Sequence, residues 1–126
     1  MAERLDRVEE LVRRELSAIV LEGVLRDPRL SDVTGFAITA AKVSADLASA
    51  RIYVDVLDEG RRTEVVAALQ AAAGRLQAML GRRIRLKRTP RLRFVYDEAL
   101  DRGRRIERLI EEVRGQDPGE DEPLGS

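Results

Sequence analysis

The strongest candidates for a functional site in this sequence are basic side chains, which could bind an anionic partner. Eight of them lie between positions 75 and 93, a stretch without Asp or Glu: Arg75, Arg82, Arg83, Arg85, Lys87, Arg88, Arg91 and Arg93. An unmixed positive run is typical of a surface that binds a phosphate backbone, whereas solvated surfaces usually mix both signs. The run does not separate RNA from DNA, an anionic lipid or an acidic protein, and a solvated face remains the alternative.

Arginine dominates these basic residues, which bears on the kind of ligand. Only Lys42 and Lys87 are lysines among the 23 basic residues. Arginine presents a planar fork of donors that matches a phosphate group. The arginine excess therefore favours phosphate binding, with arginine-rich codon usage as the alternative explanation.

Two residue types that often serve covalent or metal chemistry are missing. The sequence contains no histidine and no cysteine, which excludes disulfides, Cys/His zinc sites and any His or Cys acting as base or nucleophile. It also lacks the glycine-rich and nucleophile motifs of nucleotide-binding enzymes and hydrolases. The acid pairs Asp58-Glu59 and Asp97-Glu98 are interpreted as solvated or capping residues. We therefore expect neither an enzyme nor a bound cofactor or metal.

Length and charge predict one domain followed by an acidic tail. Residues 115–126 contain four acids, two prolines and no base, a composition that cannot bury apolar surface and predicts disorder. Residues 1–114, with 23 basic and 19 acidic side chains, form the predicted domain. The charged N-terminus and the absence of an apolar run of about 20 residues predict a cytoplasmic protein without a membrane segment.

Apolar periodicity predicts the elements that position the basic run. Helices are expected over 4–22, over 63–80 with Thr63 as N-cap and Gly81 as C-terminal stop, and around 106–113. Alternation predicts strands over 34–43, 48–58 and 91–96, the first two antiparallel. This order predicts an α+β fold, a three-stranded sheet with its apolar face under helices. Tyr53 points to the other face, as an ordinary surface tyrosine or a platform for a stacked base.

Gly74 is an unfavourable residue for its position in a predicted helix. Gly74 follows three alanines inside the second predicted helix, where glycine is about 1 kcal/mol less favourable than alanine. A local cause is needed for a sharp helix kink, and glycine is one. We therefore expect the helix to break at Gly74, so that another backbone approaches closely and Arg75 faces outward. The alternative is a glycine required only for packing against a strand.

The sequence resembles the ribosome-binding factor A family. The element order is that of a type II KH domain, but the G-x-x-G loop of KH domains is absent and Ala72-Ala73-Gly74 stands in its place, similar to the Ala-x-Gly kink of that family. The blocks "RVEELVRRELSAIV", "DPRL", "VSADLASARIYVDVL", "LGRRIRLKRTPRLRFVYDEAL" and "RGRRIERLI" match in order and spacing over about residues 4–113. The sequence departs from the family at Ala45, where a proline is expected.

The resemblance implies a KH type II-like assembly factor of bacteria. Such a protein binds the small (30S) ribosomal subunit and its immature 16S rRNA, assists late rRNA processing, supports growth in the cold and acts as a monomer without covalent chemistry. The expected RNA-binding residues are two for the kink and six for phosphate: Ala72 and Gly74, then Arg75, Arg82, Arg83, Arg85, Lys87 and Arg88. Two other classes stay open, a general single-stranded RNA-binding KH module and a protein-interaction adaptor whose basic patch meets an acidic partner.

Overall fold

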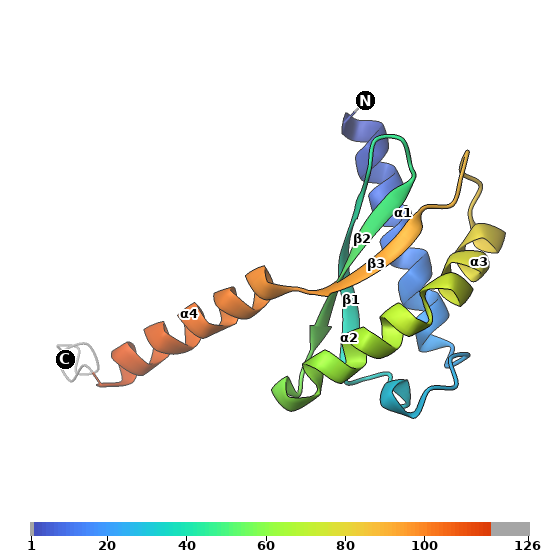
Figure 1. Ribbon diagram of the computed structural model, residues 1–126. Helices are drawn as coiled ribbons and strands as arrows, with labels where there is room; N and C mark the ends of the chain where they lie inside the picture. The colour runs from blue at the N-terminus through green and yellow to red at the C-terminus, as the bar shows by residue number, and fades with distance from the viewer. Residues whose placement is uncertain (1, 117–126) are drawn as a thin grey trace. The chain divides into compact units, whose positions relative to one another are not determined.

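The computed structural model describes residues 2–116 and confirms the predicted α+β class and element order (Figure 1). The chain divides into two compact units, residues 1–96 and 97–126. The elements are α1 (Ala2–Leu21), η1 (Pro28–Leu30), β1 (Phe36–Val43), β2 (Ser49–Val56), η2 (Glu59–Arg61), α2 (Arg62–Ala71), α3 (Ala73–Arg83), β3 (Arg91–Tyr96) and α4 (Glu98–Gln116). Of the predicted acidic tail, Gly115 and Gln116 complete α4 and the remainder lies outside the described residues, so the boundary at residue 114 stays a prediction.

The three strands form one mixed sheet in the order β1-β2-β3. β1 and β2 are antiparallel neighbours joined by a short turn, and β2 and β3 are parallel neighbours joined through α2 and α3. A register shift between Ile38 and Ala40 interrupts β1. Because successive side chains of a strand point to opposite faces, this register decides which side chains share a face.

One face of the sheet lies in the core, under the helices of the first unit. Ile52 and Val54 of β2 are fully buried, as are Leu16 of α1, Leu69 of α2 and Leu76 of α3. Burying each such side chain stabilises the fold by about 1.5–3 kcal/mol relative to leaving it in water. The opposite face of the sheet carries exposed charged residues, which are considered below.

The predicted break in the second helix is present, but it lies at Ala72, the first of the two expected kink residues, and not at Gly74. Ala72 ends α2 with φ −91° and ψ 3°, and its carbonyl accepts the first hydrogen bond of α3, from the Leu76 N–H at 2.9 Å. Gly74 lies in the first turn of α3. α2 buries Val65, Ala68 and Leu69 while α3 buries Leu76 and Leu80, and the break lets each helix turn its own apolar face to the core. Tertiary packing, which propensity does not register, therefore places the break.

Three further boundary predictions need correction. Thr63 is not an N-cap, because α2 begins at Arg62 directly after η2, which the Asp58 carboxylate caps. Gly81 does not stop α3, which continues to Arg83. A Cβ atom built on Gly81 would lie 2.9 Å from the Thr89 hydroxyl oxygen, so close packing explains the glycine at this position. The last helix is longer than predicted, and the Asp97 carboxylate accepts from the Leu100 N–H at its start.

Side chains from helices satisfy both edges of the sheet. At the β1 edge, the Glu9 carboxylate of α1 accepts a hydrogen bond from the Val43 N–H at 2.9 Å. At the β3 edge, the Gln70 side chain of α2 accepts from the Phe94 N–H at 2.9 Å and donates to the Leu92 carbonyl at 3.4 Å. Unpaired edges invite association with other strands, so these contacts protect the sheet as well as orient α1 and α2 on it.

Replacing Glu9 with alanine should destabilise the protein by about 1–2 kcal/mol, because the partly buried Val43 N–H loses its acceptor. For a domain of this size the expected fall in melting temperature is about 5 °C or more. Glu9→Gln keeps an acceptor oxygen and should melt close to wild type. Equal melting temperatures for Glu9→Ala and wild type, measured by circular dichroism, would contradict this role.

Candidate nucleic-acid interface

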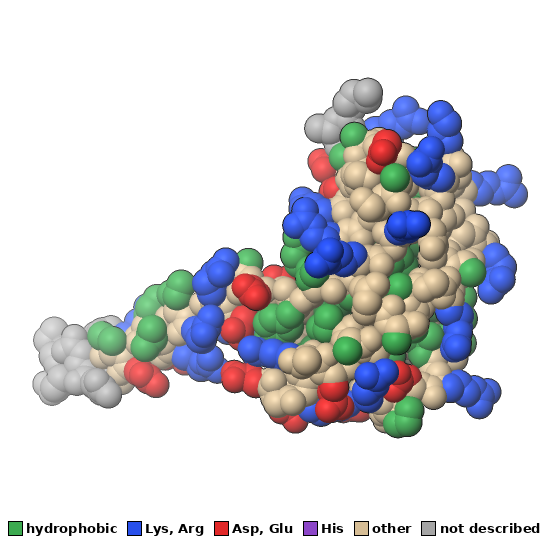
Figure 2. All heavy atoms as spheres, viewed as in Figure 1, with side chains coloured by type: hydrophobic (Ala, Val, Ile, Leu, Met, Phe, Trp, Pro, Cys, Tyr) green, Lys and Arg blue, Asp and Glu red, His purple; other side chains and the backbone are tan. Residues whose placement is uncertain are grey.

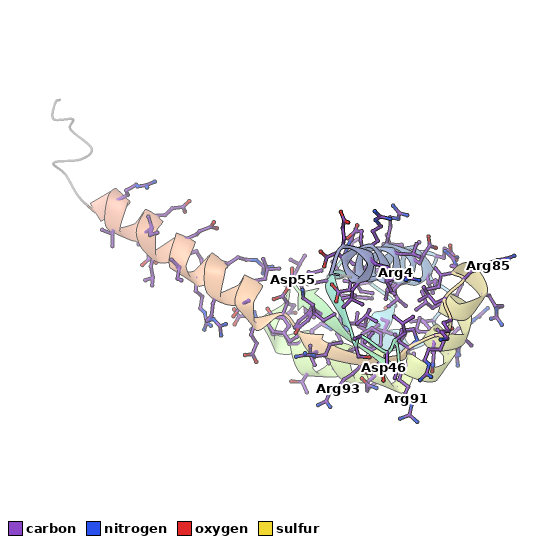
Figure 3. All side chains as sticks on the ribbon, turned by 90° about the horizontal axis from the view of Figure 1, so that it is seen from above. Arg4, Asp46, Asp55, Arg85, Arg91 and Arg93 are labelled. Carbon is purple, nitrogen blue, oxygen red and sulfur yellow. The ribbon has the colours of Figure 1, made fainter. Side chains whose placement is uncertain are left out.

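A basic hollow lies where three segments of the first unit meet, and we call it the loop groove. Its volume is about 620 Å³, and its walls come from the start of α1, the β1–β2 turn and the loop between α3 and β3. The lining residues are Arg4, Leu5, Val8, Ala45, Asp46, Leu47, Arg85, Leu86, Lys87 and Arg88. Figure 3 shows that Arg4, Asp46 and Arg85 come from separate segments, and Figure 2 shows Lys and Arg side chains gathered over this upper part of the unit.

The floor of the loop groove is apolar. Leu5, Val8, Leu47 and Leu86 are half-buried and pack against the hydrophobic core. Leu47 adopts a φ of 60°, an uncommon conformation for a branched residue. The packing therefore fixes the turn and the loop against α1 and gives the groove a defined shape.

The rim of the loop groove is positive. Arg4, Arg85, Lys87 and Arg88 are exposed, and within residues 2–116 none of them makes an ion pair. Asp46 is the acid of this site, and its carboxylate accepts from the Ser44 hydroxyl at 2.7 Å and the Ala48 N–H at 3.0 Å. These hydrogen bonds, with the charge of Arg88, lower the pKa of Asp46 below its ordinary value.

Four cations above an apolar floor suit a nucleic-acid backbone. In such an arrangement rim cations could contact phosphates and position a bound strand, and the floor could accept sugar or base surface. Because phosphate contacts carry no sequence information, a strand bound in this way would be selected by shape and charge.

A second hollow of about 400 Å³ lies beside the helix break, and we call it the kink hollow. It is lined by Leu25, Arg26, Asp27, Pro28, Ala68, Ala71, Ala72 and Arg75. Arg29 binds the Asp27 carboxylate with a donor–acceptor distance of 2.7 Å. The exposed guanidinium groups of Arg26 and Arg75 therefore dominate the charge of this hollow.

Gly74 is exposed next to the kink hollow, and its surroundings are open. A Cβ atom built on Gly74 would meet no other described atom within 4 Å. Neither close approach by another part of the described chain nor packing against a strand explains this glycine. Packing within the described residues therefore gives no reason for a glycine at this position.

The predicted RNA-binding residues separate into groups. Arg85, Lys87 and Arg88 join the loop groove, Ala72 and Arg75 line the kink hollow, and Arg82 is exposed on α3 and lines neither. The loop groove adjoins the start of α1 and the kink hollow follows its end, and a 20-residue helix spans about 30 Å.

Arg83 differs from the other predicted phosphate ligands. Its guanidinium pairs with the carboxylates of Glu15, at 3.5 Å, and Glu22, both from the α1 side of the unit. These hydrogen bonds and charges raise the pKa of Arg83 above its ordinary value. Arg83 therefore connects α3 to α1, and its charge is less available to a phosphate than that of Arg85.

Two basic residues of these sites were missed by sequence reasoning. Arg4 lines the loop groove and Arg26 lines the kink hollow. Each is flanked by residues of mixed character, so no local run of charge marks it. Arg26 meets Arg75 at the kink hollow only because the chain folds, since the two residues are far apart in the sequence.

The described residues contain no metal-binding cluster of His, Cys, Asp or Glu. In the same part of the chain, none of the helices has the length and apolar character needed to cross a membrane.

Comparisons with known proteins agree on one family. The family model described as "Ribosome-binding factor A" matches residues 4–110. Ribosome-binding factor A of Anaeromyxobacter dehalogenans strain 2CP-C is 51% identical over 119 residues, which cover 91% of this chain and 83% of that protein. The Legionella pneumophila strain Lens protein of the same name is 42% identical over 120 residues, covering 94% of each chain.

Solved structures give the same assignment. The crystal structure of ribosome-binding factor A from Thermus thermophilus superposes with a TM-score of 0.63 and 30% identity, covering 73% of this chain and 94% of that one. Coordinates of the Thermus thermophilus protein fitted into a cryo-EM map of a 30S–RbfA complex superpose with a TM-score of 0.52 and 32% identity, covering 70% and 89%. The chain therefore belongs to the ribosome-binding factor A family.

Proposed function

We propose that this chain binds the small (30S) ribosomal subunit and acts as an assembly factor during late maturation of the 16S rRNA. The observation that carries the proposal is the loop groove, in which cations from three segments surround an apolar floor. The family relationship supports the choice of partner, since a Thermus thermophilus relative has been fitted into a map of its complex with the 30S subunit.

The two basic hollows suggest how such a factor acts on RNA. The loop groove includes residues from the start of α1 and the kink hollow follows its end, so the two hollows contact separate RNA segments or different parts of one segment. A rigid protein that binds both favours the RNA arrangement in which both segments fit. Its differential affinity for the two arrangements shifts their populations without any covalent step.

The proposal also specifies the stage of ribosome assembly, the cell compartment and the residues that contact RNA. The chain acts in the cytoplasm as a monomer on the 16S rRNA precursor, helps late processing and leaves when the mature arrangement no longer fits. Arg75, Arg82, Arg85, Lys87 and Arg88 contact phosphate. Ala72 lines the kink hollow, Gly74 leaves the surface beside it open to the RNA backbone, and Arg83 contributes mainly by connecting α3 to α1.

Co-sedimentation with separated ribosomal subunits tests the proposal. The full chain should pellet with immature small subunits, less with mature ones, and not with large subunits. Equal binding to every RNA would instead indicate a general RNA-binding module. Binding that survives nuclease digestion would indicate a protein adaptor, and either result would overturn the proposed function.

A further inference from the structure

The open face of the sheet carries a row of like charges across its three strands. Lys42 of β1 is paired in register with Arg51 of β2, and Arg51 is paired with Arg93 of β3. Neighbouring strands lie about 4.8 Å apart, so these side chains are direct neighbours. Arg91 adds a fourth cation two residues before Arg93 on the same face, and Figure 3 shows both arginines projecting from the fold.

This row has little compensating negative charge. Lys42 is 4.0 Å from the Glu9 carboxylate, while Arg51, Arg91 and Arg93 make no ion pair with any residue of the range 2–116. Asp55, the acid on this face of β2, is half-buried and already interacts within the protein. Like charges facing each other on neighbouring strands destabilise a sheet. Folding alone therefore does not explain the arrangement, whereas a polyanion on this face does.

An aromatic ring accompanies the cations. Tyr53 follows Arg51 on the same face, and the Arg51 guanidinium lies 6.0 Å from its ring centroid. The residues paired with Tyr53 on the neighbouring strands are Ala40 and Val95. These short side chains do not cover the half-exposed ring. An aromatic ring beside a row of cations is the combination that binds single-stranded nucleic acid, because every base has a face that stacks.

We propose that Lys42, Arg51, Tyr53, Arg91 and Arg93 form a binding site for single-stranded RNA, the sheet-face site. The cations bind successive phosphates, and one base stacks on Tyr53. The site lies on the face of the sheet opposite the helices of the first unit and is separate from the loop groove. Arg91, whose N–H donates to the Ala48 carbonyl, stands where β3 approaches the β1–β2 turn. The proposal concerns free RNA strands and does not depend on binding to the small subunit.

Photo-crosslinking locates the contact directly. A uridine-rich RNA of about eight nucleotides, within the length that such surfaces bind, is labelled with 4-thiouridine and mixed with the full chain. The expected crosslink lies in the tryptic peptide of residues 52–61, which contains Tyr53. Crosslinks confined to peptides of the loop groove or of α4 would overturn the proposal.

Neutralising two arginines tests the role of the charge row. Arg51→Gln with Arg93→Gln should weaken binding of this RNA about tenfold at low salt. Loss of two phosphate contacts should also reduce the log–log salt slope by about 1.4. The melting temperature should equal or exceed that of wild type, because a repulsion is removed. The control, Arg7→Gln with Arg14→Gln on exposed positions of α1, makes the same charge change. A control that loses as much affinity, or a sheet variant that binds as wild type, would overturn the proposal.

Substitutions of Tyr53 test whether base stacking contributes to RNA binding in addition to charge. Tyr53→Leu should weaken single-strand binding about tenfold, the effect of losing one stacked base, whereas Tyr53→Phe should bind as wild type because it keeps the ring. An RNA duplex of the same length should bind poorly, since its bases are already stacked. Equal affinity for duplex and single strand would overturn the site as proposed.

Discussion

Replacing Arg4, Arg85 and Lys87 with glutamate should lower the affinity for immature small subunits at least about a hundredfold, or about 2.8 kcal/mol. All three line the loop groove, are exposed and make no ion pair within residues 2–116, so reversal acts on the partner and leaves the fold intact. Glutamate near the start of α1 also suits the helix dipole. If each residue contacts one phosphate of single-stranded character, the log–log salt slope should change by about 2.1.

The matched control makes the same charge change at residues that line neither hollow. Arg14→Glu, Arg102→Glu and Arg108→Glu alter three exposed arginines that line neither the loop groove nor the kink hollow. This variant should pellet with subunits nearly as wild type does. Circular dichroism melting of both proteins separates lost binding from lost folding. A folded groove variant that still pellets normally would place the interface elsewhere.

Gly74→Ala should bind immature small subunits about tenfold more weakly and yet melt at a higher temperature. The gain comes from helix propensity, up to about 1 kcal/mol, because the new methyl group meets no described atom within 4 Å. The loss is expected if, as we propose, an RNA backbone approaches Gly74, which is exposed beside the kink hollow. Opposite signs for stability and binding distinguish a residue kept for a partner from one kept for the fold.

A second helix glycine provides the control. Gly103 in α4 also faces open space, so Gly103→Ala should stabilise its helix without changing subunit binding. Melting and co-sedimentation are measured for both variants. A Gly74→Ala protein that binds as tightly as Gly103→Ala would show that no backbone approaches Gly74.

Local patterns in the sequence were enough for the elements and the core. The 3.6-residue period of α1 and the alternation in β2 identify the apolar faces, because spacing along the chain decides which residues share a helix stripe or a strand face. For the same reason the α+β order could be predicted without coordinates. Boundaries were less certain: the break at Ala72 and the continuation through Gly81 depend on what packs against α2 and α3.

The sequence by itself therefore determined that this protein has a helix-covered sheet, a basic surface and no residues for His or Cys chemistry. Only the tertiary structure decided which cations are available and which lie together. Arg83 is paired with Glu15 and Glu22, Arg4 joins Arg85 in the loop groove, and Arg51 becomes the neighbour of Arg93. Each of these contacts joins residues at least 42 positions apart in the chain. A local pattern reports spacing within one element, whereas pairing and repulsion of charges depend on distances that exist only after the elements pack.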